Sequence, residues 1–259
     1  MLRNRRPMPF EENESVFMED SYGKKHWLKV AYKMLKIHSL GTVDGERFRE
    51  LDDGSRMMVA GKEFTVFRPT TADMMASLER GAQIITPKDA EVILFRCDIR
   101  AGSTVLEVGA GSGALTIALL RAVSPNGRVL TLELREDNAQ LAGRNVRRMG
   151  FDNWECMVCD AREADPDITA DALVMDMPDP ENAFGNLLPK VRPGGMVCVY
   201  IPNANQLQNA VNAMRDAGLR DVFAYETMQR EMVVHPGGVR PSFDMLGHTG
   251  YLAFGRRTA

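Results

Sequence analysis

The chain has 259 residues, of which 44% are hydrophobic and 26% charged, so it can form one large and one smaller domain and is too apolar to be disordered. No apolar run reaches the length of a membrane-spanning helix, and no apolar stretch follows the basic segment 1–10, which predicts a cytoplasmic protein with no membrane partner. The net charge of −3 excludes a global basic field for nucleic acid, although local clusters such as Arg144, Arg147 and Arg148 could still hold phosphates.

The first part of the chain lacks a regular alternation of strands and helices. Residues 54–67 predict a β-hairpin, because two short apolar runs flank Ala60 and Gly61. Residues 30–40 have an ambiguous periodicity that is compatible with extended structure. We therefore expect a small β-rich domain at 1–78 and a second domain at 79–259.

The second domain is predicted to begin with a loop and a helix. Thr86 has the residue type of a helix N-cap, and Pro87 suits the first helical position because its missing N–H would have no partner there. From residue 103 to residue 200, strand-like and helix-like segments alternate. This alternation predicts an α/β fold with a doubly wound, Rossmann-like parallel sheet.

The most informative segment is a strand that runs into three alternate glycines, Gly109, Gly111 and Gly113, and is followed by a helical pattern at 115–123. Glycines allow a tight turn and let a ligand lie against bare backbone. The spacing G-x-G-x-G differs from the G-x-G-x-x-G of dinucleotide sites, and Glu107 would repel a pyrophosphate but suits a cationic ligand. The pattern therefore predicts S-adenosylmethionine, which carries an ammonium and a sulfonium, as the cofactor.

The start of the helix after the glycines offers backbone N–H groups to an anion. We expect the methionine carboxylate of the cofactor to be bound there. The N–H groups would come from Ser112, Gly113, Ala114 and Leu115.

Acidic side chains also end the next three predicted strands, 129–133, 157–161 and 173–176. Because ligands of open α/β sheets bind outside the carboxyl ends of the strands, these groups are expected at one site. We expect Glu133 to accept hydrogen bonds from the ribose hydroxyls, and Asp160, beside Ala161, to accept one from the adenine amino group. Asp176 is expected near the reacting methyl group. Asn138 is expected either to contact the ribose or adenine or to be a surface amide.

Two cysteines form a C-x-x-C pair, Cys156 and Cys159. We interpret them as structural, in or beside a buried strand, because no second Cys/His pair completes a metal site. The sequence therefore predicts no metal.

The end of the chain departs from the alternation. Residues 221–226 and 248–254 predict strands, and Pro236 and Pro241 exclude a long helix between them. Two strands without a crossover helix are expected to be antiparallel neighbours. A parallel sheet that ends in an antiparallel strand is typical of class I methyltransferases.

From about Gly54 to Arg257 the chain resembles the tRNA (adenine-58-N1)-methyltransferases of the bacterial and archaeal type. The glycine loop is shared by many methyltransferases, whereas the Pro-Lys-Asp segment and the Gly-His-Thr-Gly-Tyr-Leu ending are far more specific. The segments that carry the resemblance are 80–89, 106–116, 199–203, 240–241 and 247–252.

This resemblance implies a small β domain before the methyltransferase domain, a homotetramer, and methylation of tRNA at N1 of adenine 58, with adenine 57 as a further target in archaeal members. It also implies that the target nucleotide is contacted at the matching motif positions. These positions are Thr86, Tyr200, Arg240 and His248, of which His248 could instead be a structural histidine with its hydrogen bonds satisfied.

Two departures from the family pattern concern the expected target pocket. Thr86 stands where the family has a tyrosine, which removes an aromatic surface. Glu181 follows Asp179 and Pro180 where the family has Pro-Trp, which alters the pocket wall.

The chemistry of N1 methylation favours Asp176 as the catalytic residue. The enzyme has to place the weakly nucleophilic N1 in line with the sulfonium methyl, and the product is a cationic base. A carboxylate beside the N6 amino group stabilises that charge. The target adenine has to be extruded from the folded tRNA to reach such a pocket.

Two other functions remain open. One is a methyltransferase that acts on a small molecule or protein. This class includes metal-dependent O-methyltransferases, and Asp176, Asp179 and Asn182 could imitate their clustered metal ligands. The other is a non-catalytic module that binds S-adenosylmethionine or RNA, which the missing aromatic before Pro87 favours.

Overall fold

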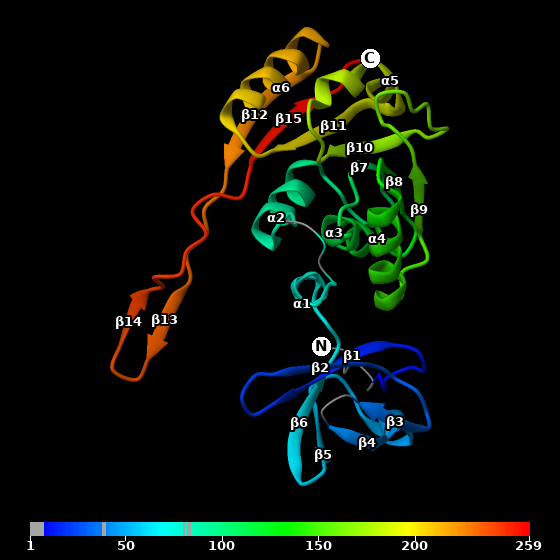
Figure 1. Cartoon of the computed structure of the whole chain (residues 1–259), viewed down its shortest axis with the longest axis vertical. Coiled ribbons are helices and arrows are strands. Elements are labelled where there is room, and N and C mark those ends of the chain that lie inside the picture. Colours follow the sequence, from blue (N-terminus) through cyan, green and yellow to red (C-terminus); the bar gives the residue numbers. More distant parts are fainter. Residues whose placement is uncertain (1–7, 38–39, 80, 82–83) are drawn as a thin grey trace, which may run out of the picture. The chain divides into compact units, whose positions relative to one another are not determined.

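The computed structural model describes residues 8–37, 40–79, 81 and 84–259 (Figure 1). Residues 80, 82 and 83 of the first family motif therefore lie outside the described part of the chain. The polypeptide divides into two compact units, residues 1–74 with 148–150 and residues 75–147 with 151–259. No helix in the described ranges has both the length and the apolar character that crossing a bilayer requires.

The first unit is built on an antiparallel four-stranded sheet with strand order β2-β1-β6-β5 and a separate β3-β4 ribbon. Phe10, Met18, Phe48 and Phe64 are in its core. The elements are β1 (Ser15–Asp20), β2 (Lys25–Lys29), β3 (Met34–Ile37), β4 (Gly41–Asp44), the 3-10 helix η1 (Gly45–Glu50), β5 (Ser55–Val59), β6 (Lys62–Phe67) and, across the division between the units, α1 (Thr71–Ala76).

The hairpin predicted at 54–67 is confirmed as β5 and β6, which pair antiparallel. Ala60 and Gly61 have φ angles of 47° and 77°, as a two-residue turn with two left-handed positions requires. The N-terminal β-rich region is thus present as expected.

The second unit contains a seven-stranded sheet with strand order β12-β15-β11-β10-β7-β8-β9. The five neighbouring strands β11, β10, β7, β8 and β9 are parallel to one another. Strand β15 is antiparallel to both of its neighbours, β11 and β12. This arrangement confirms the expected fold class. The strands are β7 (Thr104–Val108), β8 (Arg128–Glu133), β9 (Trp154–Val158), β10 (Ala170–Met175), β11 (Val191–Ile201), β12 (Arg220–Glu226) and β15 (Tyr251–Arg256).

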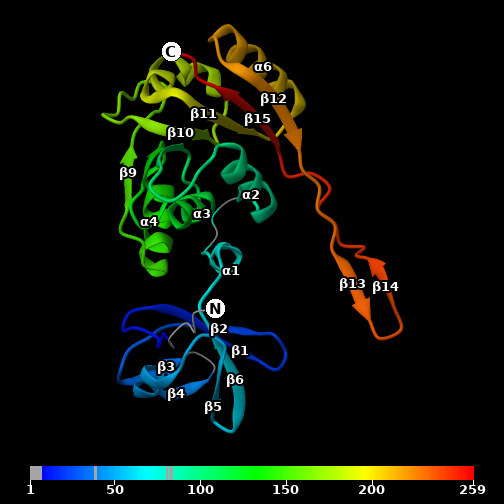
Figure 2. The ribbon, with the colours of Figure 1, turned by 180° about the vertical axis from the view of Figure 1, so that it is seen from behind.

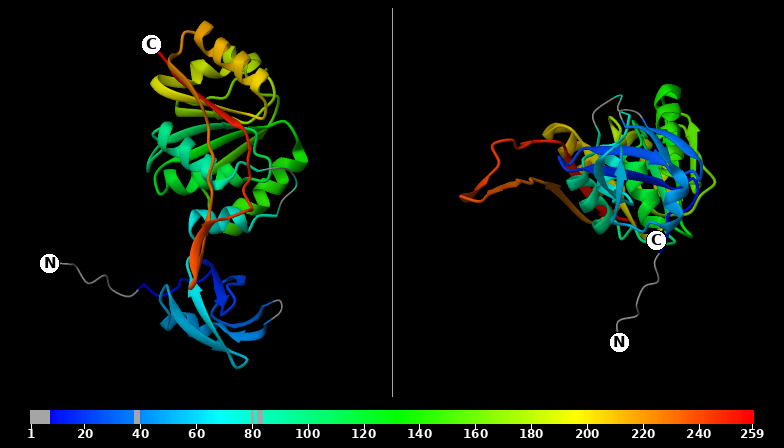
Figure 3. Two further views of the ribbon diagram at one scale, coloured as in Figure 1. Left: turned by 90° about the vertical axis from the view of Figure 1, so that its left-hand side faces the viewer. Right: turned by 90° about the horizontal axis from the view of Figure 1, so that it is seen from below.

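Helices cover both faces of this sheet, with α2, α3 and α4 on one side and α5 and α6 on the other (Figures 1 and 3). Helix α3 packs on β7 and β8, whereas α6 packs on β11, β12 and β15. The helices are α2 (Pro87–Arg96), α3 (Ala114–Val123), α4 (Glu136–Met149), the short η2 (Pro180–Ala183), α5 (Phe184–Leu187) and η3 (Leu188–Lys190), and α6 (Ala204–Asp216).

Several strand boundaries differ from the prediction: β8, β9, β10 and β12 begin earlier, and β10 ends at Met175 with Asp176 directly after it. Strand β9 ends at Val158, because the Asp160 side chain accepts a hydrogen bond from the backbone N–H of Arg162 and so forms a turn. Strand β15 begins at Tyr251, because the side chains of His248 and Thr249 bond to other segments before the strand starts.

The interpretation of the C-x-x-C strand as buried was wrong. Strand β9 lies at the edge of the sheet, and Cys156 and Cys159 are both only half-buried. The signal for a buried strand failed because Met157 and Val158 are apolar and nevertheless exposed.

A hairpin between β12 and β15 is not among the predicted elements, because Pro236 and Gly237 indicate in the sequence only a break in a helix. It consists of β13 (Met232–His235) and β14 (Gly238–Pro241) and stands out from the rest of its unit (Figure 2). We call residues 228–246 the arm. Its exposed apolar side chains are those of Met228, Met232, Val234, Val239, Phe243, Met245 and Leu246.

Candidate functional site

The largest cavity beside the glycine loop measures about 420 Å³ and lies at the carboxyl ends of β7, β8 and β10. This is the edge of the sheet where ligands of open α/β folds bind. Of the residues singled out in the sequence, the cavity is lined by Gly109, Gly111, Glu133, Asn138, Asp160, Ala161 and Asp176.

Gly109 has to be glycine for two reasons. Its φ of +88° is left-handed, and a Cβ atom there would lie 2.2 Å from the backbone oxygen of Asp176. The close approach is reinforced by a hydrogen bond of 2.8 Å from the Asp176 N–H to the carbonyl of Val108. The glycine loop and the end of β10 are therefore in direct backbone contact.

The Glu133 carboxylate holds the glycine loop from the end of β8. One oxygen accepts hydrogen bonds from the N–H groups of Ala110 and Gly111 at 2.8 and 3.1 Å, and the other accepts from Arg135 N–H at 2.9 Å. A carboxylate has about four lone-pair sites, so acceptor capacity for a ligand hydroxyl is left. The side chain is buried but still reaches the cavity wall.

Asp176 is exposed in the cavity by its surface area, while protein atoms lie closely around its carboxyl group. This burial raises the pKa of Asp176 to about 6, and the charge of Glu133 acts in the same direction. A carboxyl group in a cleft whose pKa is shifted toward neutral pH is a candidate for chemistry on a substrate.

Glu107 lies behind the glycine loop and is not a lining residue of the cavity. Its Oε2 accepts hydrogen bonds from the hydroxyls of Thr116 and Thr131 at 2.8 and 2.6 Å, while its Oε1 has no partner among the described residues. Burial raises the pKa of Glu107 to about 7 against the effect of these hydrogen bonds.

Asp160 is in the cavity wall but is already paired. Arg162 forms a bidentate contact with its carboxylate, with Nη2 at 2.6 Å, and these hydrogen bonds lower the pKa of Asp160. On the neighbouring rim, Arg135 contacts Asp137 in the same way, with Nη2 at 2.6 Å. Two guanidinium groups, which the sequence did not indicate, therefore line the cavity.

A small hollow of about 20 Å³ continues the cavity toward the start of α3. The Ser112 hydroxyl accepts a hydrogen bond from Gly81 N–H at 3.2 Å, and Gly113 is the left-handed N-cap of α3. The hollow is lined by Ile84, Ile85, Gly109, Ala110, Gly111, Ser112, Ala114, Leu115 and Asp176.

Three of the four residues implied for the target nucleotide are near the carboxyl ends of β11 and β12. The Tyr200 hydroxyl donates to the carbonyl of Thr249 at 2.6 Å, and the Thr86 hydroxyl donates to Asp89 at 3.0 Å. His248 Nδ1 lies 2.7 Å from Glu226 Oε1, and its Nε2 lies 2.9 Å from the carbonyl oxygen of Pro202.

Both contacts of His248 are with acceptors, so the ring is fully satisfied only when it carries both protons. The hydrogen bond with Glu226 accordingly raises the pKa of His248. Arg240 lies instead on β14 of the arm, where its guanidinium is 4.3 Å from the centre of the Phe243 ring.

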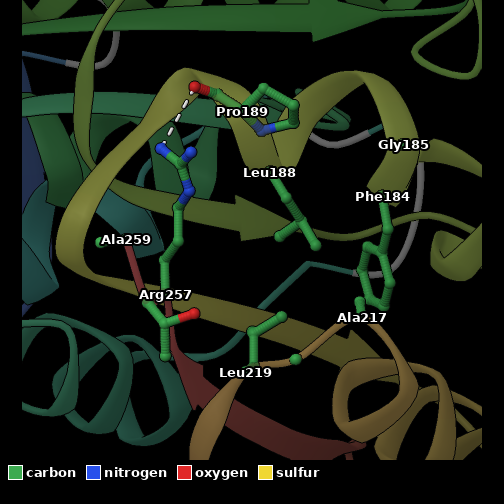
Figure 4. A pocket seen from close by; sticks show the side chains of 10 residues that line it. Phe184, Gly185, Leu188, Pro189, Ala217, Leu219, Arg257 and Ala259 are labelled. Carbon is green, nitrogen blue, oxygen red and sulfur yellow. Dashed lines mark hydrogen bonds between the residues drawn. The ribbon is translucent and has the colours of Figure 1, made fainter.

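A separate cavity of about 340 Å³ lies near the opposite end of β11 and is lined mainly by apolar groups, among them Phe184, Leu188 and Leu219 (Figure 4). Its charged group, Arg257, donates to the carbonyl of Pro189 at 3.2 Å. Among the described residues that line it, no side chain is an acid, and the guanidinium is occupied by backbone carbonyls, so this cavity is a poor site for chemistry.

The family model described as tRNA methyltransferase complex GCD14 subunit matches residues 64–239 of the chain. The chain belongs to this family. Together with the sheet topology, this makes it a class I S-adenosylmethionine-dependent methyltransferase, and the family resemblance seen in the sequence is confirmed.

Relatives in this family extend over most of the chain. One from Methanocaldococcus jannaschii, named tRNA (adenine(57)-N(1)/adenine(58)-N(1))-methyltransferase TrmI, is 32% identical and aligns over 92% of this chain and 93% of its own length. One from Thermus thermophilus, named tRNA (adenine(58)-N(1))-methyltransferase TrmI, is 31% identical over 85% of this chain and 88% of its own.

Two solved structures are similar over nearly the whole chain. The tRNA (m1A58) methyltransferase TrmI of Aquifex aeolicus has a TM-score of 0.75 and 25% identity, covering 97% of this chain and 100% of its own. A protein described as a SAM-dependent O-methyltransferase from Thermotoga maritima has a TM-score of 0.81 and 26% identity, covering 96% and 94%.

The residues around the glycine loop fit the cofactor of this family. The loop backbone is bare, the cavity wall carries carboxylate and amide acceptors, and the buried Oε1 of Glu107 has no protein partner among the described residues. Among the same described residues, no group of three or more His, Cys, Asp or Glu side chains is arranged to hold a metal ion.

The sequence reasoning missed several residues of the site. The missed residues of the cavity directly follow or precede strand ends that were identified, so the signal was their position rather than their type. They are Val108, Leu132, Leu134, Arg135, Arg162, Met177 and Pro178, together with Ile84 and Ile85 of the small hollow, whereas Cys159 and Asp179 were named in the sequence for other roles.

Proposed function

We propose that the chain transfers a methyl group from S-adenosylmethionine to N1 of adenine 58 of tRNA, with adenine 57 as a second candidate position. The observation that carries this proposal is the contact between the glycine loop and Asp176 in a member of a tRNA methyltransferase family. The names of the relatives from Methanocaldococcus jannaschii and Thermus thermophilus support the substrate and the atom.

The proposed cofactor site uses the residues gathered at the strand ends. Glu133 accepts from the ribose hydroxyls, Asn138 contacts the ribose or adenine, and Asp160 beside Ala161 faces the adenine amino group. The methionine carboxylate is bound by backbone N–H groups from Ser112 to Leu115, and Glu107 contributes negative charge beneath the loop. When bound, the cofactor supplies an electrophilic methyl group.

In the proposed reaction, Asp176 is the catalytic residue. Its carboxylate accepts a hydrogen bond from the N6 amino group of the extruded adenine and so stabilises the positive charge that develops on the base. The protein otherwise contributes by positioning N1 in line with the methyl carbon. Tyr200 and His248 shape the adjoining wall, and Arg240 contacts the tRNA from the arm.

The two departures from the family pattern lie beside this proposed pocket. Thr86 stands at the N-cap position of α2 without a capping hydrogen bond from its side chain, which instead donates to the Asp89 carboxylate. A threonine offers no ring for the target base. Asp179 has a left-handed φ of 50° in the cavity wall, directly before Pro180 and Glu181. We propose that base stacking at this position is weaker than in a pocket that has the tyrosine.

We further propose a homotetramer in the cytoplasm, with residues 1–78 and 79–259 as its domains. The exposed apolar side chains of the arm support self-association, because a patch of this kind commonly marks an interface. Light scattering of the purified protein measures the assembly, and a monomer at micromolar concentration would contradict it.

The test of the function is to map methylated adenines in tRNA after incubation with the protein and cofactor. We expect N1-methyladenosine at position 58, and transcripts in which adenine 57 or 58 is replaced by another base decide between the positions. A product methylated on oxygen, or transfer to a small molecule in preference to tRNA, would reject the proposal. Binding of the cofactor without transfer to any substrate would indicate a non-catalytic module.

A further inference from the structure

A closed network of polar side chains lies at the start of α2, outside the cavity described above. It consists of Lys88, Asp89, Thr227 and Thr249, and we call it the clamp. Asp89 is completely buried, and the side chain of Lys88 is 10% exposed. All four residues belong to the second unit.

Every polar atom at the centre of the clamp has a partner. Lys88 Nζ donates to Asp89 Oδ1 at 2.8 Å, to Thr227 Oγ1 at 2.9 Å and to Thr249 Oγ1 at 2.6 Å. Both threonine hydroxyls in turn donate to the Asp89 carboxylate, Thr249 at 2.7 Å to Oδ2. Burial opposes ionisation of Asp89, but the hydrogen bonds from Lys88, Thr227, Thr249 and Thr86 outweigh it and lower its pKa.

The two threonines are where the arm joins the sheet. Thr227 directly follows the last residue of β12, and Thr249 stands two residues before the first residue of β15. The clamp therefore holds both stems of the arm against the first turn of α2, although Thr227 and Thr249 are 138 and 160 residues from Asp89 along the chain.

The clamp also connects to the wall of the pocket that contains Asp176. The carbonyl of Thr249 accepts the Tyr200 hydroxyl, and the next residue, Gly250, packs so closely that a Cβ atom would lie 2.4 Å from the Tyr200 ring. In the sheet register Val199 is opposite Met175, which places Tyr200 beside Asp176.

The charges of the clamp and of the pocket act on the same tyrosine. Burial raises the pKa of Tyr200 to about 12, with the charges of Asp89 and Asp176 acting in the same direction. The clamp is also linked to the small hollow through the chain itself. Ile84 and Ile85 line that hollow together with Asp176, and they directly precede Thr86 and the start of α2.

A buried ion pair is weak support for stability, because desolvation offsets much of the attraction. What this pair does supply is a fixed geometry, since its charges are satisfied only when the start of α2 and both arm stems are in place. We propose that Lys88 and Asp89 are positioning residues for methyl transfer, which hold the arm stems, Tyr200 and Ile85 in the arrangement that presents the target adenine to Asp176. This inference rests on the proposed function.

The experiment removes the hydroxyls of the clamp without changing its volume. Thr227→Val and Thr249→Val are compared with Thr227→Ser and Thr249→Ser, which retain the hydroxyl. For each protein, kcat and KM for tRNA are measured at saturating cofactor, and the Kd of the cofactor is measured by calorimetry. Circular dichroism checks that each variant is folded.

We expect each valine variant to lose kcat by about 10- to 100-fold, as expected for a small misplacement of reacting groups, with the cofactor Kd changed less than about twofold. The serine variants should recover most of the rate. The double variant Lys88→Met/Asp89→Asn, which buries no charge, should show the same loss of kcat while remaining folded.

Valine variants with the wild-type kcat would overturn the inference, as would equal losses in the valine and serine variants. A loss that is confined to thermal stability, with kcat unchanged for the folded protein, would also overturn it. Wild-type protein that transfers no methyl group to tRNA would overturn the proposed function and the inference together. That result is distinct from active wild type with active valine variants, which overturns the clamp alone.

Discussion

The two halves of the seven-stranded sheet hold their carboxylates in different ways. In the glycine-loop half, formed by β7, β8, β9 and β10, Glu133 is bonded by backbone N–H groups from Ala110 and Gly111. In the clamp half, formed by β11, β12, β15 and the start of α2, Asp89 is bonded by side chains from three separate segments, which contain Lys88, Thr227 and Thr249. The first arrangement joins groups that are 22 and 23 residues apart along the chain, whereas the second joins Asp89 to threonines that are 138 and 160 residues away.

This difference suggests that the two halves can be damaged separately. The glycine-loop half should control cofactor binding, whereas the clamp half and Asp176 should control what happens to the second substrate.

The largest effect is expected for Asp176→Asn. Loss of the carboxylate should lower kcat by about 100- to 1000-fold, because it removes the charge that stabilises the methylated base. The cofactor Kd, measured by calorimetry, should change only slightly. Asp216→Asn on the exposed end of α6 is the matched control and should leave both values unchanged. Full transfer activity of Asp176→Asn would refute the catalytic role.

Gly109→Ala should instead damage the glycine-loop half. The new Cβ would lie 2.2 Å from the Asp176 backbone oxygen, so the loop has to move and the cofactor Kd should rise more than about tenfold. Gly102→Ala is the comparison for backbone strain, because Gly102 has the same φ of +88° but no atom of the described residues lies within 4 Å of its Cβ position. Equal effects of the two changes on cofactor binding would show that strain rather than the close approach matters.

The pH dependence of transfer should reveal the state of Asp176. Its raised pKa of about 6 means that the carboxylate is lost as the pH falls through 6, so kcat/KM should fall about tenfold per pH unit below that value. Cofactor affinity across the same range separates this effect from acid damage to the site. A profile that is flat from pH 7 to pH 5 would contradict the assignment.

Glu107→Gln should have the smallest effect, which concerns stability. The pKa of about 7 in the folded state exceeds the usual 4.5, so the folded protein binds a proton that the unfolded chain releases, and stability falls as the pH rises from 4.5 to 7. The variant lacks this penalty and should gain at most about 3 kcal/mol relative to wild type at pH 8, and much less at pH 5. Urea unfolding at both pH values measures the difference, and an equal difference at both would contradict the raised pKa.

The sequence predicted the features that depend on local patterns. The strand before the glycines, the hairpin at Ala60 and Gly61 and the Pro87 helix start are each encoded within a few residues, so the fold class followed from the sequence alone. The acidic groups at the strand ends were found for the same reason, because a parallel sheet brings carboxyl ends together.

The sequence did not predict features that depend on distant partners. Nothing near Thr227 or Thr249 indicates a bond to Asp89, which lies 138 and 160 residues away along the chain. The burial of Glu107 behind the loop depends on Thr116 and Thr131, which lie on two other elements. The arm was missed because Pro236 and Gly237 break a helix but equally suit the tip of a hairpin.

The position of β15 between β11 and β12 has a consequence for biosynthesis. The ribosome synthesises β11 and β12 before β15, and β11 and β12 do not pair with each other. The edge of each strand that will face β15 therefore stays unpaired until residues 251–256 emerge. The nascent chain therefore carries two unpaired β-edges while the arm is being translated. Closing the sheet around the late strand removes both edges in one step.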